Sequence, residues 1–234
     1  MAPSTTTLRR ATRADLPRMV RILLDAYAPG PWGRCIFPPH LKVKPGDGDE
    51  FDWRLYMVSA GLDSPGRDTI LACEGGEEEE EEEEIVGWAQ WIDLVASSRG
   101  GGASREDMNA RLERELGASP AGLDKEALER LSAEGRLLEK SFGEFLGTER
   151  AKESLHLNYL VIDPNHQRKG IGRLLAQDGL ERAAGQGRDV CLRSTPEGRP
   201  LYLALGFRQV LEQKVIGESQ YAMVWTAYDP ARST

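Results

Sequence analysis

Residues 155 to 172 read LHLNYLVIDPNHQRKGIG and contain the most informative pattern in this chain. The apolar run predicts a buried strand, Asp163-Pro164 predicts a turn, and the loop from Gln167 to Gly172 opens directly into a helix. At such a junction the unpaired backbone N–H groups and the positive end of the helix dipole point toward one place. A phosphate or pyrophosphate group suits that place.

The two glycines of this loop let a phosphate approach the backbone, because a Cβ at Gly170 or Gly172 would hold it away. The loop does not match two well-known nucleotide motifs. A dinucleotide fingerprint needs a third glycine three residues after Gly172, where Leu175 stands. A Walker A loop needs a Gly-Lys pair followed by Ser or Thr, which this loop lacks. Dinucleotide and nucleoside triphosphate chemistry are therefore disfavoured.

Hydrophobic periodicity places the loop in a series of strands and helices. The series predicts one α/β domain over residues 1–234, with a mixed sheet and helices on both faces. Residues 28–48 hold five prolines and four glycines, and we expect a long irregular loop there. Strands are expected at 5–9, 69–73, 85–92, 154–162, 189–193, 207–211 and 221–226, and helices at 14–27, 50–61, 170–185 and 197–205.

Two further segments interrupt this series. Glu77 to Glu84 is an unbroken run of glutamates between two predicted strands, and we expect a solvated, disordered hairpin loop. A contact with a basic partner is the alternative. Removing these eight charges from the net charge of −8 leaves a neutral remainder, so the acidity belongs to one segment. Residues 97–105 predict a flexible linker, and residues 104–148 predict a helical insertion packed on the sheet.

Composition limits the setting of the protein. Cys35, Cys73 and Cys191 lack the spacing of metal ligands, so we expect three reduced thiols and no metal site. No apolar run approaches the roughly 20 residues of a membrane span, and the N-terminus lacks the apolar core of a signal peptide. We expect a cytoplasmic location, with the nucleus as a second one, and neither a membrane nor a nucleic-acid partner.

The glycine loop resembles the acyl-CoA loop of the GNAT N-acetyltransferase family, written Q/R-x-x-G-x-G/A. The apolar strand before it, the helix after it, and YLALGF at residues 202–207, which matches Y-x-x-x-G-F, stand where that family has them. Residues 8–23 and 85–91 are similar to the family's start and third strand. The resemblance covers nearly the whole chain outside the glutamate run and the insertion, and fungal members with an insertion look most similar.

The resemblance implies the GNAT fold, a mixed and mostly antiparallel sheet whose fourth and fifth strands, here 154–162 and 189–193, splay apart. It also implies an acyltransferase that uses acetyl-CoA as co-substrate and a primary amine as acceptor. The pyrophosphate would bind Gln167, Arg168, Lys169, Gly170, Ile171 and Gly172. The pantetheine arm would pair with the strand edge at Leu160, Val161 and Ile162.

Three residues stand where the resemblance implies catalytic roles. His156, eleven residues before Gln167, would be the general base, and Asn158 would help to place a water. Tyr202 would be the general acid that protonates the departing thiolate. The alternatives are a strand histidine hydrogen-bonded to its neighbours and a tyrosine that packs a short helix onto the sheet. A backbone N–H of Leu160 or Val161 could bind the oxyanion.

The acceptor pocket is the least defined part of the prediction. Trp32, Phe37, Trp88 and Ser194 are candidates to contact the substrate, because loops and strand ends often carry binding residues. Trp88 and Trp91 should face opposite sides of one strand, so at most one of them faces the pocket. A bulky insertion can cap a small pocket, and we therefore expect a small-molecule amine.

Three other functions remain open. A protein or peptide amine could be the acceptor, the chain could bind acyl-CoA without catalysis, or the glutamate run could hold a basic partner. The sequence leaves the acyl chain length and the oligomeric state open.

Overall fold

The computed structural model describes residues 6–28, 30–75, 83–99, 105–116 and 119–228. Within these residues seven strands form one sheet in the order β1-β2-β3-β4-β5-β7-β6. The strands are β1 Thr7–Arg10, β2 Arg67–Glu74, β3 Glu84–Asp93, β4 Leu155–Ile162, β5 Val190–Ser194, β6 Arg208–Val215 and β7 Glu218–Trp225.

Nine α-helices surround the sheet in the described residues: α1 Leu16–Tyr27, α2 Trp32–Ile36, α3 Gly48–Leu62, α4 Leu94–Arg99, α5 Arg105–Leu116, α6 Lys125–Leu146, α7 Thr148–Glu153, α8 Ile171–Gly185 and α9 Arg199–Ala204. Short 3-10 helices are η1 Arg13–Asp15, η2 Pro39–Leu41 and η3 Pro164–His166. None of the described helices is long and apolar enough to cross a membrane.

The pairing of β4 with β5 is the feature that opens the sheet. Every other neighbouring pair is antiparallel, whereas β4 and β5 run parallel. They pair only from Leu155 to Leu157 on β4 and from Val190 to Leu192 on β5. Beyond this point β4 continues to Ile162 without a β5 partner, so one edge of its second half is open. The predicted mixed sheet with splayed fourth and fifth strands is confirmed.

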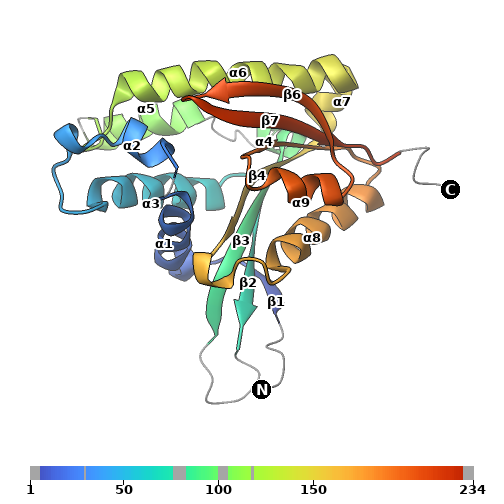
Figure 1. The fold of residues 1–234 in the computed structure, drawn as a ribbon, viewed down its shortest axis with the longest axis horizontal. Coiled ribbons are helices and arrows are strands. Elements are labelled where there is room, and N and C mark those ends of the chain that lie inside the picture. Colours follow the sequence, from blue (N-terminus) through green and yellow to red (C-terminus); the bar gives the residue numbers. More distant parts are fainter. Residues whose placement is uncertain (1–5, 29, 76–82, 100–104, 117–118, 229–234) are drawn as a thin grey trace.

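One face of the sheet carries two separate groups of helices. Helices α1 and α3 cover β2, β3 and β4, with Met19, Trp88 and Val161 in their shared apolar cluster. Helix α6 lies along β6 and β7 (Figure 1) and packs Leu138 and Phe142 onto the same face. The part of the face over the β4–β5 opening therefore lies between these two groups.

The opposite face is covered by α8 and α9. Leu175 and Ala183 of α8 pack with Trp91 of β3 in one buried cluster. The close approach requires a glycine, because a Cβ at Gly179 would lie 1.9 Å from Cζ2 of Trp91. Trp88 and Trp91 thus point to opposite faces, as the strand alternation predicts.

Several local predictions need correction. Residues 28–48 hold α2 and η2 in place of an irregular loop, and Leu94–Arg99 is a helix that enters the predicted linker. Most of the glutamate run lies outside the described residues. Glu83 and Glu84, at its end, pair with Arg9 and Arg18, at 2.6 Å and 3.2 Å. Arginines that face the hairpin therefore fix these two charges.

Candidate active site

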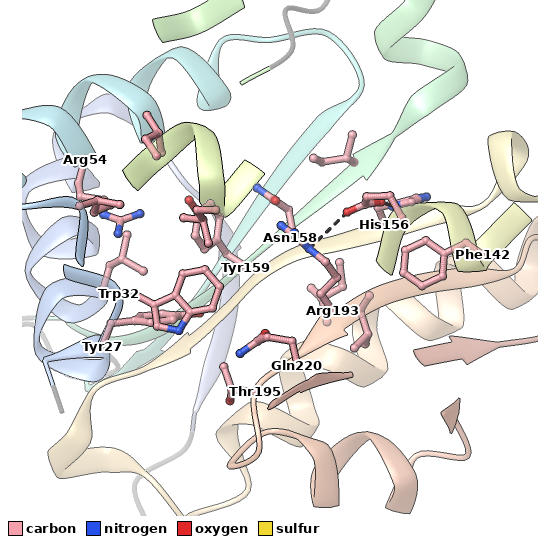
Figure 2. A pocket seen from close by; sticks show the side chains of 18 of the residues that line it. Tyr27, Trp32, Arg54, Phe142, His156, Asn158, Tyr159, Arg193, Thr195 and Gln220 are labelled. Atoms are coloured by element: carbon pink, nitrogen blue, oxygen red, sulfur yellow. Dashed lines mark ion pairs between the residues drawn. The ribbon is translucent and has the colours of Figure 1, made fainter. Parts of the chain in front are cut away.

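A cavity of about 300 Å³ lies where β4 and β5 part, on the face of the sheet that carries α1, α3 and α6. Its walls come from α1, α2, α3 and α6, and its floor from β4 and β5. Figure 2 shows His156, Asn158 and Tyr159 along β4, within this cavity. Aromatic side chains form much of the wall: Tyr27, Trp32, Trp53, Phe142 and Tyr159.

His156 is held deep in this cavity by α6. Its ring meets Phe142 edge-on, with ring centroids 5.6 Å apart, and its Nδ1 lies 4.0 Å from Oε2 of Glu139. Its Nε2 is buried and has no hydrogen-bond partner among the described residues. Burial lowers the pKa of His156 below its ordinary value, and the Glu139 carboxylate only partly opposes this shift. The imidazole is therefore neutral near pH 7 and can accept a proton.

Asn158 occupies a β-bulge. Gln90 of β3 faces Tyr159 and Trp91 faces Leu157, which leaves Asn158 as the extra residue of β4. Its Nδ2 donates to Oε1 of the buried Gln90 at 2.9 Å. Because a bulge re-aims side chains, Asn158 and its neighbour Tyr159 both line the cavity. The bulge was not predicted, since nothing in the β4 sequence marks which residue lacks a partner.

Glu139 and Arg193 form an ion pair beside His156 that was not predicted. Oε1 of Glu139 lies 3.3 Å from Nε of Arg193, and both side chains line the cavity. Gly135 of α6 makes room for this arginine, because a Cβ there would lie 2.5 Å from Nη1. The helical spacing from Glu139 to Phe142 puts both on one face of α6, which was the available signal.

The glycine loop faces the open edge of β4. Gly170 has φ +89° and precedes α8, and Arg168 also has a positive φ of 65°. A Cβ at Gly172 would lie 3.4 Å from Cδ2 of Leu201 and 3.7 Å from Cγ1 of Ile162. The glycine thus leaves open a space between β4 and α9 that a side chain would fill. The start of α8 and this space fit a pyrophosphate with an extended arm beside β4.

The strand residues predicted to hold the cofactor arm differ from one another. Leu160 and Ile162 are half-buried and point toward Gly172. Val161 is 2% exposed, because its side chain packs with α1 on the other face. Val161 can therefore contact a ligand only through its backbone. Gln167 closes the turn by donating from Nε2 to the Ile162 carbonyl at 3.3 Å.

Tyr202 lies on the opposite side of the sheet opening from His156. Its ring meets Phe207 edge-on at 5.5 Å between centroids, and a Cβ at Gly198 would lie 3.3 Å from its Cε2. Burial raises the pKa of Tyr202 above its ordinary value, so the phenol stays protonated near pH 7. Tyr202 belongs to the apolar cluster under α8 and does not line the cavity.

Three predicted substrate residues lie outside the cavity wall and are corrected here. Trp88 is fully buried against α1 and donates from Nε1 to the Met19 carbonyl at 3.0 Å. Phe37 packs on Trp53 with centroids 5.6 Å apart. Ser194 is 1% exposed and its hydroxyl donates to the backbone carbonyl of the next residue. Trp32 and Thr195 do line the cavity, together with Gln220 and Arg54, two residues that were not predicted.

One group of side chains elsewhere could offer metal ligands. Within the described residues, atoms of Glu84, Asp163 and His166 lie within 4.8 Å of one another. The guanidinium of Arg18 already pairs with both carboxylates, at 3.2 Å from Glu84 and 2.6 Å from Asp163. This group therefore acts as an ion-pair link between α1 and the turn after β4.

Several solved structures similar to this fold are named as acetyltransferases. A Corynebacterium glutamicum protein named histone acetyltransferase HPA2 and related acetyltransferase has a TM-score of 0.58 and 20% identity, covering 97% of this chain and 99% of that one. A further acetyltransferase has a TM-score of 0.54 and 16% identity, with 95% and 100% covered. Mosquito arylalkylamine N-acetyltransferase like 5b has a TM-score of 0.50 and 14% identity, again with 95% and 100% covered. At these identities the likeness concerns the fold.

The sequence itself matches one family model. No curated protein matches the chain significantly. The model described as an acetyltransferase (GNAT) domain matches residues 123–221, a segment that begins just before α6 and contains His156, the glycine loop and Tyr202. Residues 123–221 thus match a GNAT acetyltransferase domain, and the sheet that opens between β4 and β5 agrees with the GNAT fold.

Proposed function

We propose that this protein transfers an acetyl group from acetyl-CoA to a primary amine of a small molecule, with His156 as general base and Tyr202 as general acid. The observation that carries the proposal is the position of His156, whose buried Nε2 has no partner in the described residues and whose imidazole lines a cavity at the β4–β5 opening. The small volume of the cavity, about 300 Å³, favours a small molecule over a protein segment.

The donor would approach through the opening between β4 and β5. Backbone N–H groups from Arg168 to Gly172 would hold the pyrophosphate at the start of α8, and the charges of Arg168 and Lys169 would lie nearby. The unpaired edge of β4 from Leu160 to Ile162 offers backbone groups to the pantetheine arm. Acetyl-CoA supplies a thioester carbonyl that the amine attacks, with loss of the thiolate.

His156 would prepare the amine for attack. An ammonium has no lone pair, so a base must remove one proton before nitrogen can form the new bond. Burial keeps the imidazole unprotonated near pH 7, and its acceptor nitrogen can take that proton directly or through a water. Asn158, fixed by its hydrogen bond to Gln90, could position the water. After transfer, the proton rests on the imidazole.

Tyr202 would complete the exchange at the sulfur. The thiolate that leaves the carbonyl carbon needs a proton, and a phenol held protonated by burial can provide it. The nitrogen loses its second proton to water as the amide forms, and the phenolate regains a proton from water as the products leave. In this scheme the base and the acid approach the opening from different sides of the sheet. His156 acts on the amine nitrogen that forms the new bond, and Tyr202 acts on the sulfur that leaves.

A thiol-release screen with acetyl-CoA and a panel of amines tests this proposal. We expect thiol release with at least one small amine, and a fall in kcat/KM toward low pH as His156 becomes protonated. His156→Gln should lower kcat/KM by about 10²–10⁴-fold and remove that part of the pH profile, the range typical of general-base catalysis. Release that is unchanged in rate and pH profile by the substitution would contradict the role of His156.

A further inference from the structure

Two hydrogen-bond donors line the cavity without a partner. Nε1 of Trp32 and Nε2 of Gln220 are buried, and the described residues provide no acceptor for either. Gln220 is only 4% exposed. Buried polar groups in native proteins nearly always have a partner. Two such donors in one cavity therefore mark a place where a bound molecule would supply an oxygen.

These donors lie apart from the proposed base. In Figure 2, Trp32 and Gln220 lie on the Thr195 side of the cavity, whereas His156 and Phe142 lie at its other end. Trp32 comes from α2 and Gln220 from β7, so the two approach from separate elements. A ligand whose nitrogen reaches His156 would extend its remaining atoms toward them.

The charges on the cavity wall also restrict the ligand. Arg54 lines the cavity and pairs with Glu50 behind it at 3.1 Å, with both side chains 13% exposed. Glu139 is the carboxylate of the described wall, and it already faces Arg193 and His156. A second positive charge on the acceptor would find no uncommitted carboxylate on this wall. Polyamines and lysine-rich peptides are therefore poor candidates.

Much of the remaining wall is apolar. Leu23, Leu128 and Leu131 contribute aliphatic surface beside the aromatic rings named above, and Asn158 and Thr195 add polar groups. At about 300 Å³ the cavity is at the small end of ligand sites. Its size and surface suit a body of roughly one aromatic ring.

From these observations we propose that the acceptor is a primary amine that also carries a carbonyl or carboxylate oxygen on a small aromatic or apolar body. The oxygen accepts hydrogen bonds from Nε1 of Trp32 and Nε2 of Gln220. The assignment of the amine rests on the proposed acetyl transfer. The oxygen site rests on the two unpaired donors and can be tested without turnover.

Three amines with the same body provide the kinetic test: 2-phenylethylamine, phenylalanine and phenylalaninamide. The first lacks the oxygen, the second carries a carboxylate and the third carries an amide carbonyl. Wild-type kcat/KM is compared with that of Trp32→Phe and Gln220→Leu for each amine. The three amines differ in intrinsic reactivity. Dividing the wild-type kcat/KM by the variant kcat/KM for the same amine removes this difference.

We expect each substitution to lower kcat/KM about tenfold for an oxygen-bearing amine, the factor that one lost hydrogen bond costs. The same substitutions should change kcat/KM for 2-phenylethylamine less than threefold. A loss for phenylalanine alone assigns a carboxylate, and a loss for both oxygen-bearing amines assigns a carbonyl-type acceptor. Equal losses for all three amines would overturn the proposal.

Trp91→Phe is the matched control. Nε1 of Trp91 is also buried without a partner in the described residues, but its ring packs against α8 on the other face of the sheet. Its removal should leave the ratios between amines unchanged. Gln213 faces Gln220 across β6 and β7. If these two amides simply bind each other, Gln220→Leu will lower thermal stability without changing selectivity, and the Gln220 part of the proposal fails.

A binding measurement separates this inference from acetyl transfer. 3-Phenylpropanamide and 3-phenylpropanoate carry the oxygen and the ring but no amine. Saturation-transfer NMR with the wild-type protein should detect at least one of them, with a weaker signal for Trp32→Phe. If no amine is acetylated while this binding persists, the proposed function fails and the oxygen site stands. If neither compound binds and turnover is insensitive to both substitutions, the oxygen site is wrong.

Discussion

At the scale of single residues, the same physical cause acts in opposite directions on the two proposed proton carriers. Burial disfavours the charged form of each group. It therefore lowers the pKa of His156 and raises the pKa of Tyr202, which leaves a neutral base and a neutral acid near pH 7. Both groups are thus in the protonation state that their proposed roles require.

The pKa of His156 has a consequence for stability. An unfolded histidine binds protons near pH 6.5, whereas folded His156 does so only at lower pH. Between these two values the unfolded state binds more protons, so the free energy of unfolding falls as pH drops below about 6.5. We predict that urea denaturation from pH 7.5 to 5.5 shows this loss in the wild type and a smaller loss in His156→Gln.

A surface histidine controls for this measurement. His40 is exposed on η2, and His40→Gln should leave the wild-type dependence on pH intact. If His156→Gln and the wild type lose stability equally on acidification, the folded protein does not hold this imidazole neutral by burial.

Tyr202 supports a second prediction, on kinetics. Tyr202→Phe keeps the ring that packs edge-on against Phe207 and removes only the hydroxyl. We expect kcat to fall about 10²–10⁴-fold, because the thiolate then leaves without a proton donor, while the affinity for acetyl-CoA measured by calorimetry stays within about twofold. An unchanged kcat together with lower stability would make Tyr202 a packing residue only.

At this scale the sequence predicted some site residues and missed others for identifiable reasons. His156 and Asn158 could be located because they lie at fixed distances from the glycine loop along one strand. Trp88 was misplaced because it lies on the face of the sheet that carries the cavity but under α1, and strand alternation does not show which part of a face a helix covers. Glu139 and Gln220 reach the site from α6 and β7, far from the loop in sequence, and their approach depends on tertiary packing.

At the scale of elements, the junction between β4 and α8 could be predicted most fully. The apolar run, the Asp163-Pro164 turn and the two glycines specify strand, turn and helix start locally, and the structure has them within a residue or two. By contrast, α2 forms in a segment rich in proline and glycine, where its burial of Ile36 in the core outweighs local preference.

Gly170 allows a test of this junction. Its φ of +89° is strained for a residue with a Cβ, although nothing lies within 4 Å of where that Cβ would be. We predict that Gly170→Ala lowers the free energy of unfolding by about 1 kcal/mol and weakens acetyl-CoA binding severalfold by shifting the backbone before α8. Urea denaturation and calorimetric titration measure the two effects.

Gly185, at the other end of α8, is the matched control. It also has open space around the position of a Cβ, but its φ is not positive. Gly185→Ala should therefore leave acetyl-CoA affinity unchanged and stabilise the helix by up to about 1 kcal/mol. If both substitutions have the same effect on binding, the backbone conformation of the loop does not contribute to holding the donor.

At the scale of the whole molecule, the N-terminal and C-terminal halves are joined at the turn that precedes the glycine loop. Arg18 of α1 donates to the Ile85 carbonyl on β3 at 3.1 Å and to Oδ2 of Asp163 at 2.6 Å. The side chain of Asp163 is 7% exposed and also accepts the N–H of Asn165. One guanidinium thus connects a helix, a strand and the turn after β4, and the sequence spacing of these residues could not have revealed it.

This link leads to a prediction about stability. Arg18→Ala leaves the buried Asp163 carboxylate with fewer partners, and we expect it to lower the free energy of unfolding by about 1–3 kcal/mol at pH 7. Hydrogen bonds and the charge of Arg18 hold the pKa of Asp163 below its ordinary value against the opposing effect of burial. The stability that this carboxylate contributes is therefore present above about pH 4 and lost as pH falls through its folded pKa.

The difference between wild type and Arg18→Ala should accordingly narrow in urea denaturation below pH 4. Arg13→Ala provides the comparison, because Arg13 and Asp63 form an ion pair whose side chains are 72% and 47% exposed. Exposed pairs contribute about 0–1 kcal/mol, since water screens them, so Arg13→Ala should have little effect at either pH. If the two arginine variants lose the same small amount at pH 7, Arg18 does not join the two halves, and apolar packing between α1 and the sheet carries that connection alone.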